Sequence, residues 1–214
     1  INENVRSAFA LSNESEAELQ ATLAEERLEE AEELAVRGEL DLDASTDIRA
    51  RVESHYNDAI ERSDKAEAGG DFETSATVRA SLLGTFRTHA DILSRIDLKV
   101  WNDASASLVS DLEAYTASTL RAQSTATADV STDSSVDVLA TVERADAIVT
   151  SVGALLARAE SKLSADVYAR IDARFNEAVR VETEAKVSLR SEMYREAYTH
   201  AQTAIRIAKE VEAL

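Results

Sequence analysis

The sequence predicts an all-α fold, and three observations favour it. Hydrophobic residues make up 44% of the 214 positions, but aromatic residues only 5%; the chain has 5 Gly and no Pro. A core made mainly of Ala, Leu, Ile and Val, with so few turn-forming residues, is more typical of helices than of strands. Apolar side chains also recur at helical spacing, and one segment occurs twice. Together these features predict two tandem antiparallel helical-bundle units.

The repeat joins residues 45–60 to residues 164–179, so that each position matches the one 119 residues later. Six of the sixteen pairs are identical, and apolar residues recur every four positions in both copies. Such spacing places them along one helix face, which predicts a duplicated helical unit that buries the same face twice. The large apolar pairs are Ile48/Val167, Val52/Ile171 and Tyr56/Phe175.

Capping residues and breaks in the apolar pattern divide the chain into about eight helices. Gly38 is expected to end the second helix and Asp71 to begin the fourth, while Ser45 and Ser164 are expected to cap the third and seventh. The fifth helix is expected to start at 97 or at 102–103, although one continuous rod with the fourth is an alternative. The expected helices cover residues 2–11, 13–37, 45–67, 71–96, 97–122, 136–156, 164–188 and 191–211.

A composition change marks the expected boundary between the two units. Residues 123–135 are mostly Ser, Thr, Asp and Ala, which predicts a linker or an exposed loop. The first bundle unit then covers residues 1–122 and the second covers residues 136–214. Short connections predict antiparallel packing of neighbouring helices within each unit.

The charge is strongly acidic, with 41 Asp and Glu against 23 Lys and Arg, a net charge of −18 and a pI of about 4.5. This balance argues against nucleic acids and anionic lipid surfaces as partners, and favours a basic protein. The absence of Cys excludes disulfides and thiolate metal sites. No apolar run approaches the ~18 residues of a membrane span, so direct insertion of this segment is not expected. Six glutamates between 25 and 33 are expected to form a solvated helix face.

Histidines are the only candidate metal ligands beyond the many carboxylates. His55 and His89 lie on consecutive expected helices and are the candidate pair for a divalent ion, whereas Glu196 and His200 are four residues apart on the last helix. No nucleophile motif and no glycine-rich phosphate loop occurs. The sequence therefore predicts a non-enzymatic protein without a cofactor, and a metal site only as the alternative.

Five segments, residues 3–12, 21–35, 37–38, 70–73 and 88–93, carry a resemblance to a known family. They cover roughly the first 95 residues and resemble a bacterial helical domain of unknown function. The resemblance implies an extracytoplasmic domain tethered by a signal or membrane-anchor helix upstream of Ile1, with an envelope component as an expected partner besides a basic protein. It implies no activity and no catalytic residues.

Two functions from different classes follow. The first is a non-enzymatic interaction or spacer module of a bacterial cell envelope protein. The second is a helical bundle that binds a divalent metal or a small ligand through His55 and His89. A filament or coat subunit is a weaker third, because Ala-rich helix faces favour self-association; the oligomeric state stays open.

Overall fold

A computed structural model describes residues 13–95, 103–129 and 135–214, and within them every regular element is helical. The all-α prediction is therefore confirmed for these residues. The expected helix over residues 2–11 lies outside them. The elements are α2 (Asn13–Arg37), α3 (Leu42–Ala68), α4 (Phe72–Arg95), α5 (Asp103–Asp129), α6 (Ser135–Ala159), the 3-10 turn η1 (Glu160–Lys162), α7 (Ala165–Arg190) and α8 (Tyr194–Glu212).

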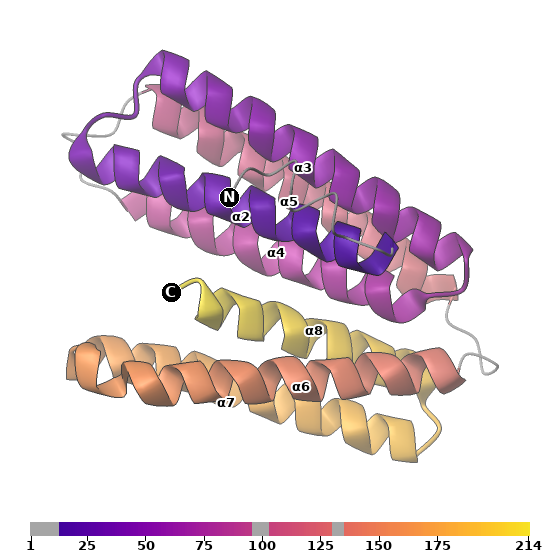
Figure 1. The fold of residues 1–214 in the computed structure, drawn as a ribbon. Coiled ribbons are helices and arrows are strands. Elements are labelled where there is room, and N and C mark those ends of the chain that lie inside the picture. Colours follow the sequence, from indigo (N-terminus) through magenta and orange to yellow (C-terminus); the bar gives the residue numbers. More distant parts are fainter. Residues whose placement is uncertain (1–12, 96–102, 130–134) are drawn as a thin grey trace.

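The helices form two layers (Figure 1). Helices α2, α3, α4 and α5 make the four-helix layer, and α6, α7 and α8 make the three-helix layer. Helix α4 packs against α2, α3 and α5 in its own layer and also against α6 and α8 in the other. The two layers therefore meet mainly along α4 and α8.

Local capping explains where most helices begin and end. Gly38 adopts φ 73° after α2, and Gly70 adopts φ 90° after α3, a conformation that glycine reaches without strain. The Asp71 carboxylate accepts a hydrogen bond from the Thr74 backbone N at 3.0 Å, as expected. The turn expected at 188–191 lies later, at residues 191–193, since α7 ends at Arg190 and α8 begins at Tyr194.

Helix α3 begins earlier than the sequence predicted. Asp41, and not Ser45, is its N-cap, because the Asp41 carboxylate accepts a hydrogen bond from the Ala44 backbone N at 2.8 Å. Ser45 lies inside the helix and is buried. Ser164 does cap α7, through its Oγ and the Val167 backbone N. The two repeat segments therefore differ at their first residue.

The expected 123–135 linker is partly helical. Residues 123–129 continue α5, residue 135 begins α6, and residues 130–134 lie outside the described residues. The small polar side chains there do not end the helix, because the Thr125 and Thr127 hydroxyls donate to the carbonyls of Arg121 and Gln123 four residues earlier. Helices α4 and α5 are separate and pack against each other, so a single rod is excluded.

The core has two parts, and α4 belongs to both. Val78, Leu82 and Phe86 pack into the core of the four-helix layer, while Ala76 and Ala80 pack into the core of the three-helix layer. In α4, 15 of the 24 residues are buried, compared with 7 of 27 in α3. Helix α4 therefore exposes little surface to solvent. The apolar side chains on one of its faces pack into the core of the three-helix layer.

Small residues allow α4 and α8 to approach closely. Ala76, Ala80 and Gly84 follow one another at every fourth position of α4, and α8 contributes buried Ala201 and Ala208. A Cβ atom added at Gly84 would lie 2.8 Å from the Arg206 carbonyl oxygen and 2.9 Å from the Lys209 Cβ. The first atom is part of the α8 backbone and the second is bonded directly to it, so α8 itself would have to move.

We expect Gly84→Ala to destabilise the protein, although alanine is the better helix former. Overpacking of this kind costs about 1–3 kcal/mol, which corresponds to a loss of on the order of 5 °C in the unfolding midpoint. Gly153→Ala is the matched control, because its Cβ would meet mainly the Phe175 ring tip, which can shift. Equal midpoints for both variants in calorimetry would contradict the close approach.

Candidate functional site

The structure does not bring the two candidate histidines together. The His55 Nδ1 lies 2.7 Å from the Gln20 Oε1, and the His89 Nδ1 lies 2.6 Å from the Glu32 Oε1. Gln20 and Glu32 are twelve residues apart on α2, which separates them by about 18 Å along the helix. The two imidazoles therefore contact α2 at distant points and cannot share an ion.

His200 lies apart from both, with its Nδ1 3.4 Å from the Ser188 Oγ in the three-helix layer. Within the described ranges, no group of three or more His, Asp and Glu side chains has a geometry that could hold a metal ion. Also within these ranges, no helix is both long enough and apolar enough to cross a bilayer.

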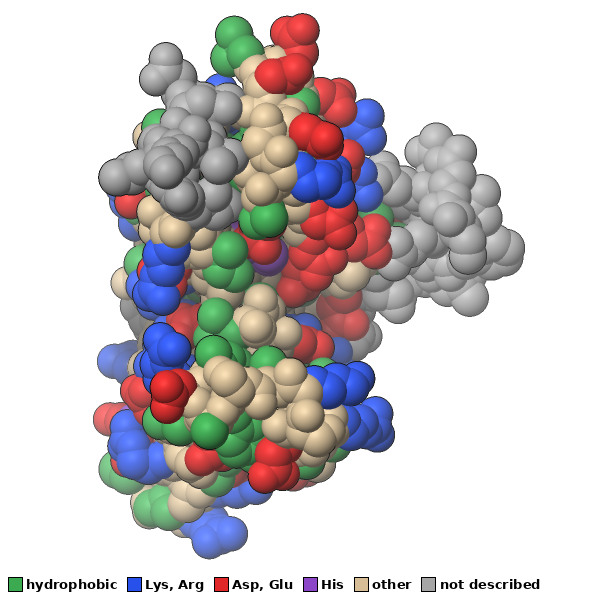
Figure 2. Space-filling model, turned by 90° about the vertical axis from the view of Figure 1, so that its left-hand side faces the viewer, with side chains coloured by type: hydrophobic (Ala, Val, Ile, Leu, Met, Phe, Trp, Pro, Cys, Tyr) green, Lys and Arg blue, Asp and Glu red, His purple; other side chains and the backbone are tan. Residues whose placement is uncertain are grey.

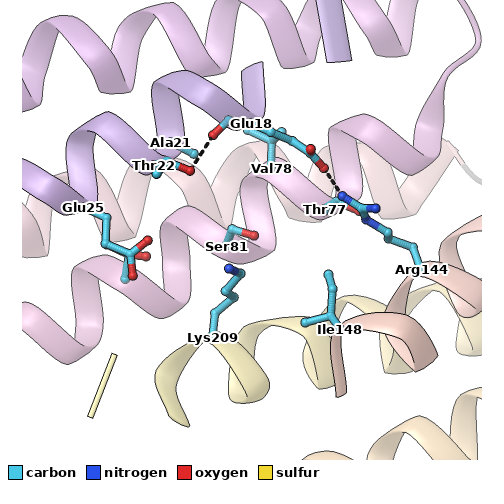
Figure 3. A pocket seen from close by; sticks show the side chains of 11 residues that line it. Glu18, Ala21, Thr22, Glu25, Thr77, Val78, Ser81, Arg144, Ile148 and Lys209 are labelled. Carbon is cyan, nitrogen blue, oxygen red and sulfur yellow. Dashed lines mark hydrogen bonds and ion pairs between the residues drawn. The ribbon is translucent and has the colours of Figure 1, made fainter. Parts of the chain in front are cut away.

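A small polar cavity lies between the layers instead (Figure 3). Its volume is about 160 Å³, and side chains of α2, α4, α6 and α8 line it. It is bounded on one side by α2 and α4 and on the other by α6 and α8. The lining residues are Glu18, Ala21, Thr22, Glu25, Thr77, Val78, Ser81, Thr85, Arg144, Ile148 and Lys209.

Two ion pairs satisfy most of the charges in the cavity wall. Arg144 of α6 pairs with Glu18 of α2 and so ties the two layers together at one end. The Lys209 Nζ of α8 lies 2.6 Å from the Glu212 carboxylate, which belongs to the same helix. Figure 3 shows Lys209 and Ser81 pointing toward each other across the cavity.

Glu25 is the exception among these charged groups. Neither an ion pair nor a side-chain hydrogen bond joins its carboxylate to any residue in the described part of the chain. Burial raises the pKa of Glu25, and the positive charges of Lys209 and His89 only partly oppose this effect. The cavity therefore contains a mostly desolvated carboxylate without a bonded partner.

Thr77 adds a second unsatisfied group. Its side chain is 4% exposed, and the Oγ1 has no hydrogen-bond partner among the described residues. Ser81 and Thr85 follow at four-residue spacing, so a row of hydroxyls runs along the α4 side of the cavity. A row of hydroxyls and an unpaired carboxylate form a site that can accept hydrogen bonds from a cationic or polar group.

The surface charge is unevenly divided between the layers. Residues 13–95 and 103–129 contain 25 Asp and Glu against 10 Lys and Arg, a net charge of −15. Residues 135–214 contain 13 against 11, a net charge of −2. Figure 2 shows acidic side chains gathered over part of the upper, four-helix layer. Nearly all the net negative charge of the described residues is therefore on one layer.

Sequence reasoning anticipated the acidic helix but missed the cavity. The lining residues come from four helices and span positions 18 to 209, and no local motif connects them. A search of protein-family models, of curated proteins and of solved structures found no match to this chain.

We expect Glu25→Gln to stabilise the fold at neutral pH, because it removes a half-buried charge without a bonded partner while keeping the side-chain shape. Since the folded pKa of Glu25 is raised, the wild-type penalty is absent below the unfolded carboxyl pKa of about 4.3. This destabilising penalty grows as the pH rises from the unfolded pKa through the folded pKa of Glu25, and it reaches its full size above the folded pKa. The gain in unfolding midpoint is expected to be on the order of 2 °C at pH 7.

Thermal unfolding between pH 4 and pH 7 measures this difference. Glu29→Gln is the control, because Glu29 is one turn further along α2 and is exposed. A Glu25→Gln variant that is no more stable than wild type at pH 7, or whose gain does not shrink toward pH 4, would contradict the desolvation of Glu25.

Proposed function

We propose that the protein is a non-enzymatic helical interaction module whose four-helix layer binds a basic partner. The observation that carries this proposal is the charge division between the layers, with −15 on the four-helix layer and −2 on the three-helix layer. A concentrated field of one sign attracts a partner of the opposite sign and speeds its association.

Helix α2 is the centre of this surface. Glu29, Glu30 and Glu33 are exposed on it, and beside them the half-buried Glu25 and Glu32 approach the boundary between the layers. Intrahelical pairs neutralise part of the charge, since Arg27 contacts Glu30 and Arg37 contacts Glu33. Exposed pairs of this type contribute little to stability, so their carboxylates are free to exchange partners.

The resemblance of roughly the first 95 residues supports a location outside the cytoplasmic membrane, tethered by an upstream segment. In that setting the seven described helices act as a spacer that displays the acidic layer. Fractionation of the native host, with an antibody against this chain, tests this part separately. Recovery in the cytosol instead of the envelope fraction would refute the location but leave the binding surface untouched.

We also propose that α2–α4 and α6–α8 arose by duplication of a three-helix unit. Pairs of buried residues at the 119-residue offset support this, namely Val52/Ile171, Ala59/Ala178 and Ala66/Ala185. The chemistry of the two units has diverged, because His55 corresponds to Arg174. Any site built on the acidic layer therefore belongs to one unit only.

A small-ligand-binding bundle is the second candidate function, and the cavity beside Glu25 is the observation that favours it. The histidines proposed from the sequence do not line this cavity.

We expect the triple variant Glu29→Gln, Glu30→Gln and Glu33→Gln to bind a lysine-rich peptide at least tenfold more weakly than wild type at low salt. The reason is the loss of three exposed charges from α2. Binding to the wild type is also expected to weaken steeply as salt rises, because the contacts are exposed. Titration calorimetry at two salt concentrations measures both effects.

The matched control removes three exposed charges from the three-helix layer, with Glu143→Gln, Glu160→Gln and Glu196→Gln. We expect it to bind within about twofold of wild type. Equal losses in the two triple variants would show that net charge alone, and not the α2 surface, governs binding.

A further inference from the structure

We propose that the cavity between the layers binds a primary ammonium group carried on a short alkyl chain, with Glu25 as its counterion. This inference does not depend on peptide binding by the exposed face of α2. It rests on the Glu25 carboxylate, which lines the cavity without a bonded partner, on the hydroxyl-lined wall of α4 and on the charge around Glu25.

The charges around the cavity leave one negative charge uncompensated. Arg144 and Glu18 neutralise each other at one end. At the other end Lys209 lies near two carboxylates, with an ion pair to Glu212 and only a longer-range attraction to Glu25. One ammonium ion would bring this end to neutrality, and the described residues include no group of three side chains that could hold a metal ion instead.

The hydrogen-bonding groups also fit an ammonium ion. Such an ion has three N–H donors and no acceptor, so it needs oxygen atoms that accept. Glu25 and Thr22 of α2 and Thr85 of α4 line the cavity and carry oxygen atoms of this kind. Charge-assisted bonds to a carboxylate are the strong members of this class.

Size and apolar lining restrict the rest of the ligand. The cavity, of about 160 Å³, has room for a small ligand only. A butyl chain with its ammonium group, with five non-hydrogen atoms, is a ligand of this class. Ala21, Val78 and Ile148 supply apolar surface for the methylene groups. Both a free amine and a lysine side chain of a partner present this chemistry.

Titration of the full chain with n-butylammonium chloride, followed by NMR, tests the proposal. We expect saturable shifts confined to residues of α2, α4, α6 and α8 around the cavity, with a dissociation constant in the millimolar range. Sodium chloride and tetramethylammonium chloride at the same concentrations control for ionic strength and for a cation that cannot donate hydrogen bonds. Equal shifts with these salts would overturn the proposal.

Glu25→Gln is expected to weaken n-butylammonium binding at least tenfold while it stabilises the fold, so failure to fold cannot explain the loss. Glu29→Gln, one turn away on the surface, is expected to bind like wild type. Unchanged binding in Glu25→Gln, or no saturable shift in wild type because water alone fills the cavity, would overturn the proposal.

A lysine tripeptide with blocked ends distinguishes the two sources of the ammonium group. Binding at least as tight as that of n-butylammonium, lost in Glu25→Gln, assigns the cavity to a partner's lysine. Binding of the free amine alone assigns it to a small metabolite-like amine. Both results support the ammonium site, and failure of both ligands refutes it even if the exposed α2 face binds peptides.

Discussion

The close approach of α4 and α8 at Gly84 is the constraint on which the rest of the structure depends. A single missing Cβ lets the backbone of α8 lie against α4, and the Ala residues at every fourth position extend that contact. Because α4 also completes the core of its own layer, it is buried on nearly all sides. Two sets of helices thereby become one structure, in which the core of the three-helix layer includes Ala76 and Ala80 of α4.

The cavity is a consequence of the same arrangement. Beside the small residues of α4, the space between the layers is lined by hydroxyls and by long charged side chains such as Arg144 and Lys209, which do not fill it as apolar residues would. The wall therefore retains a carboxylate at Glu25 that forms no bond and weakens the fold. Residues that reduce stability in this way are typical of binding sites, where function opposes stability. The charged surface of α2 continues from this point onto the solvent face.

Much of the fold could be predicted from the sequence because helices are specified locally. The turns after Gly38 and Gly70 follow from glycine chemistry, and the apolar face of α3 follows from its spacing. Two local predictions were wrong for physical reasons. The N-cap of α3 is Asp41 instead of Ser45, because the Asp41 carboxylate bonds the first turn of the helix. Residues 123–129 are helical instead of forming a linker, and threonine hydroxyls there bond to backbone carbonyls within α5. The candidate site could not be predicted, because it depends on how α2 and α4 meet α6 and α8. The sequence predicted that His55 and His89 could lie close together. In the structure each contacts a different residue of α2, Gln20 for His55 and Glu32 for His89.

The central claim is that α4 joins the two layers into a single cooperative unit. Native-state hydrogen exchange, read residue by residue at increasing denaturant, tests it most directly. The account predicts that the slowest amides of α4, α8 and α3 exchange with the same free energy of opening and the same denaturant dependence. If α6, α7 and α8 instead open together at a much lower free energy while α2–α5 stay protected, the layers are independent and the claim is wrong.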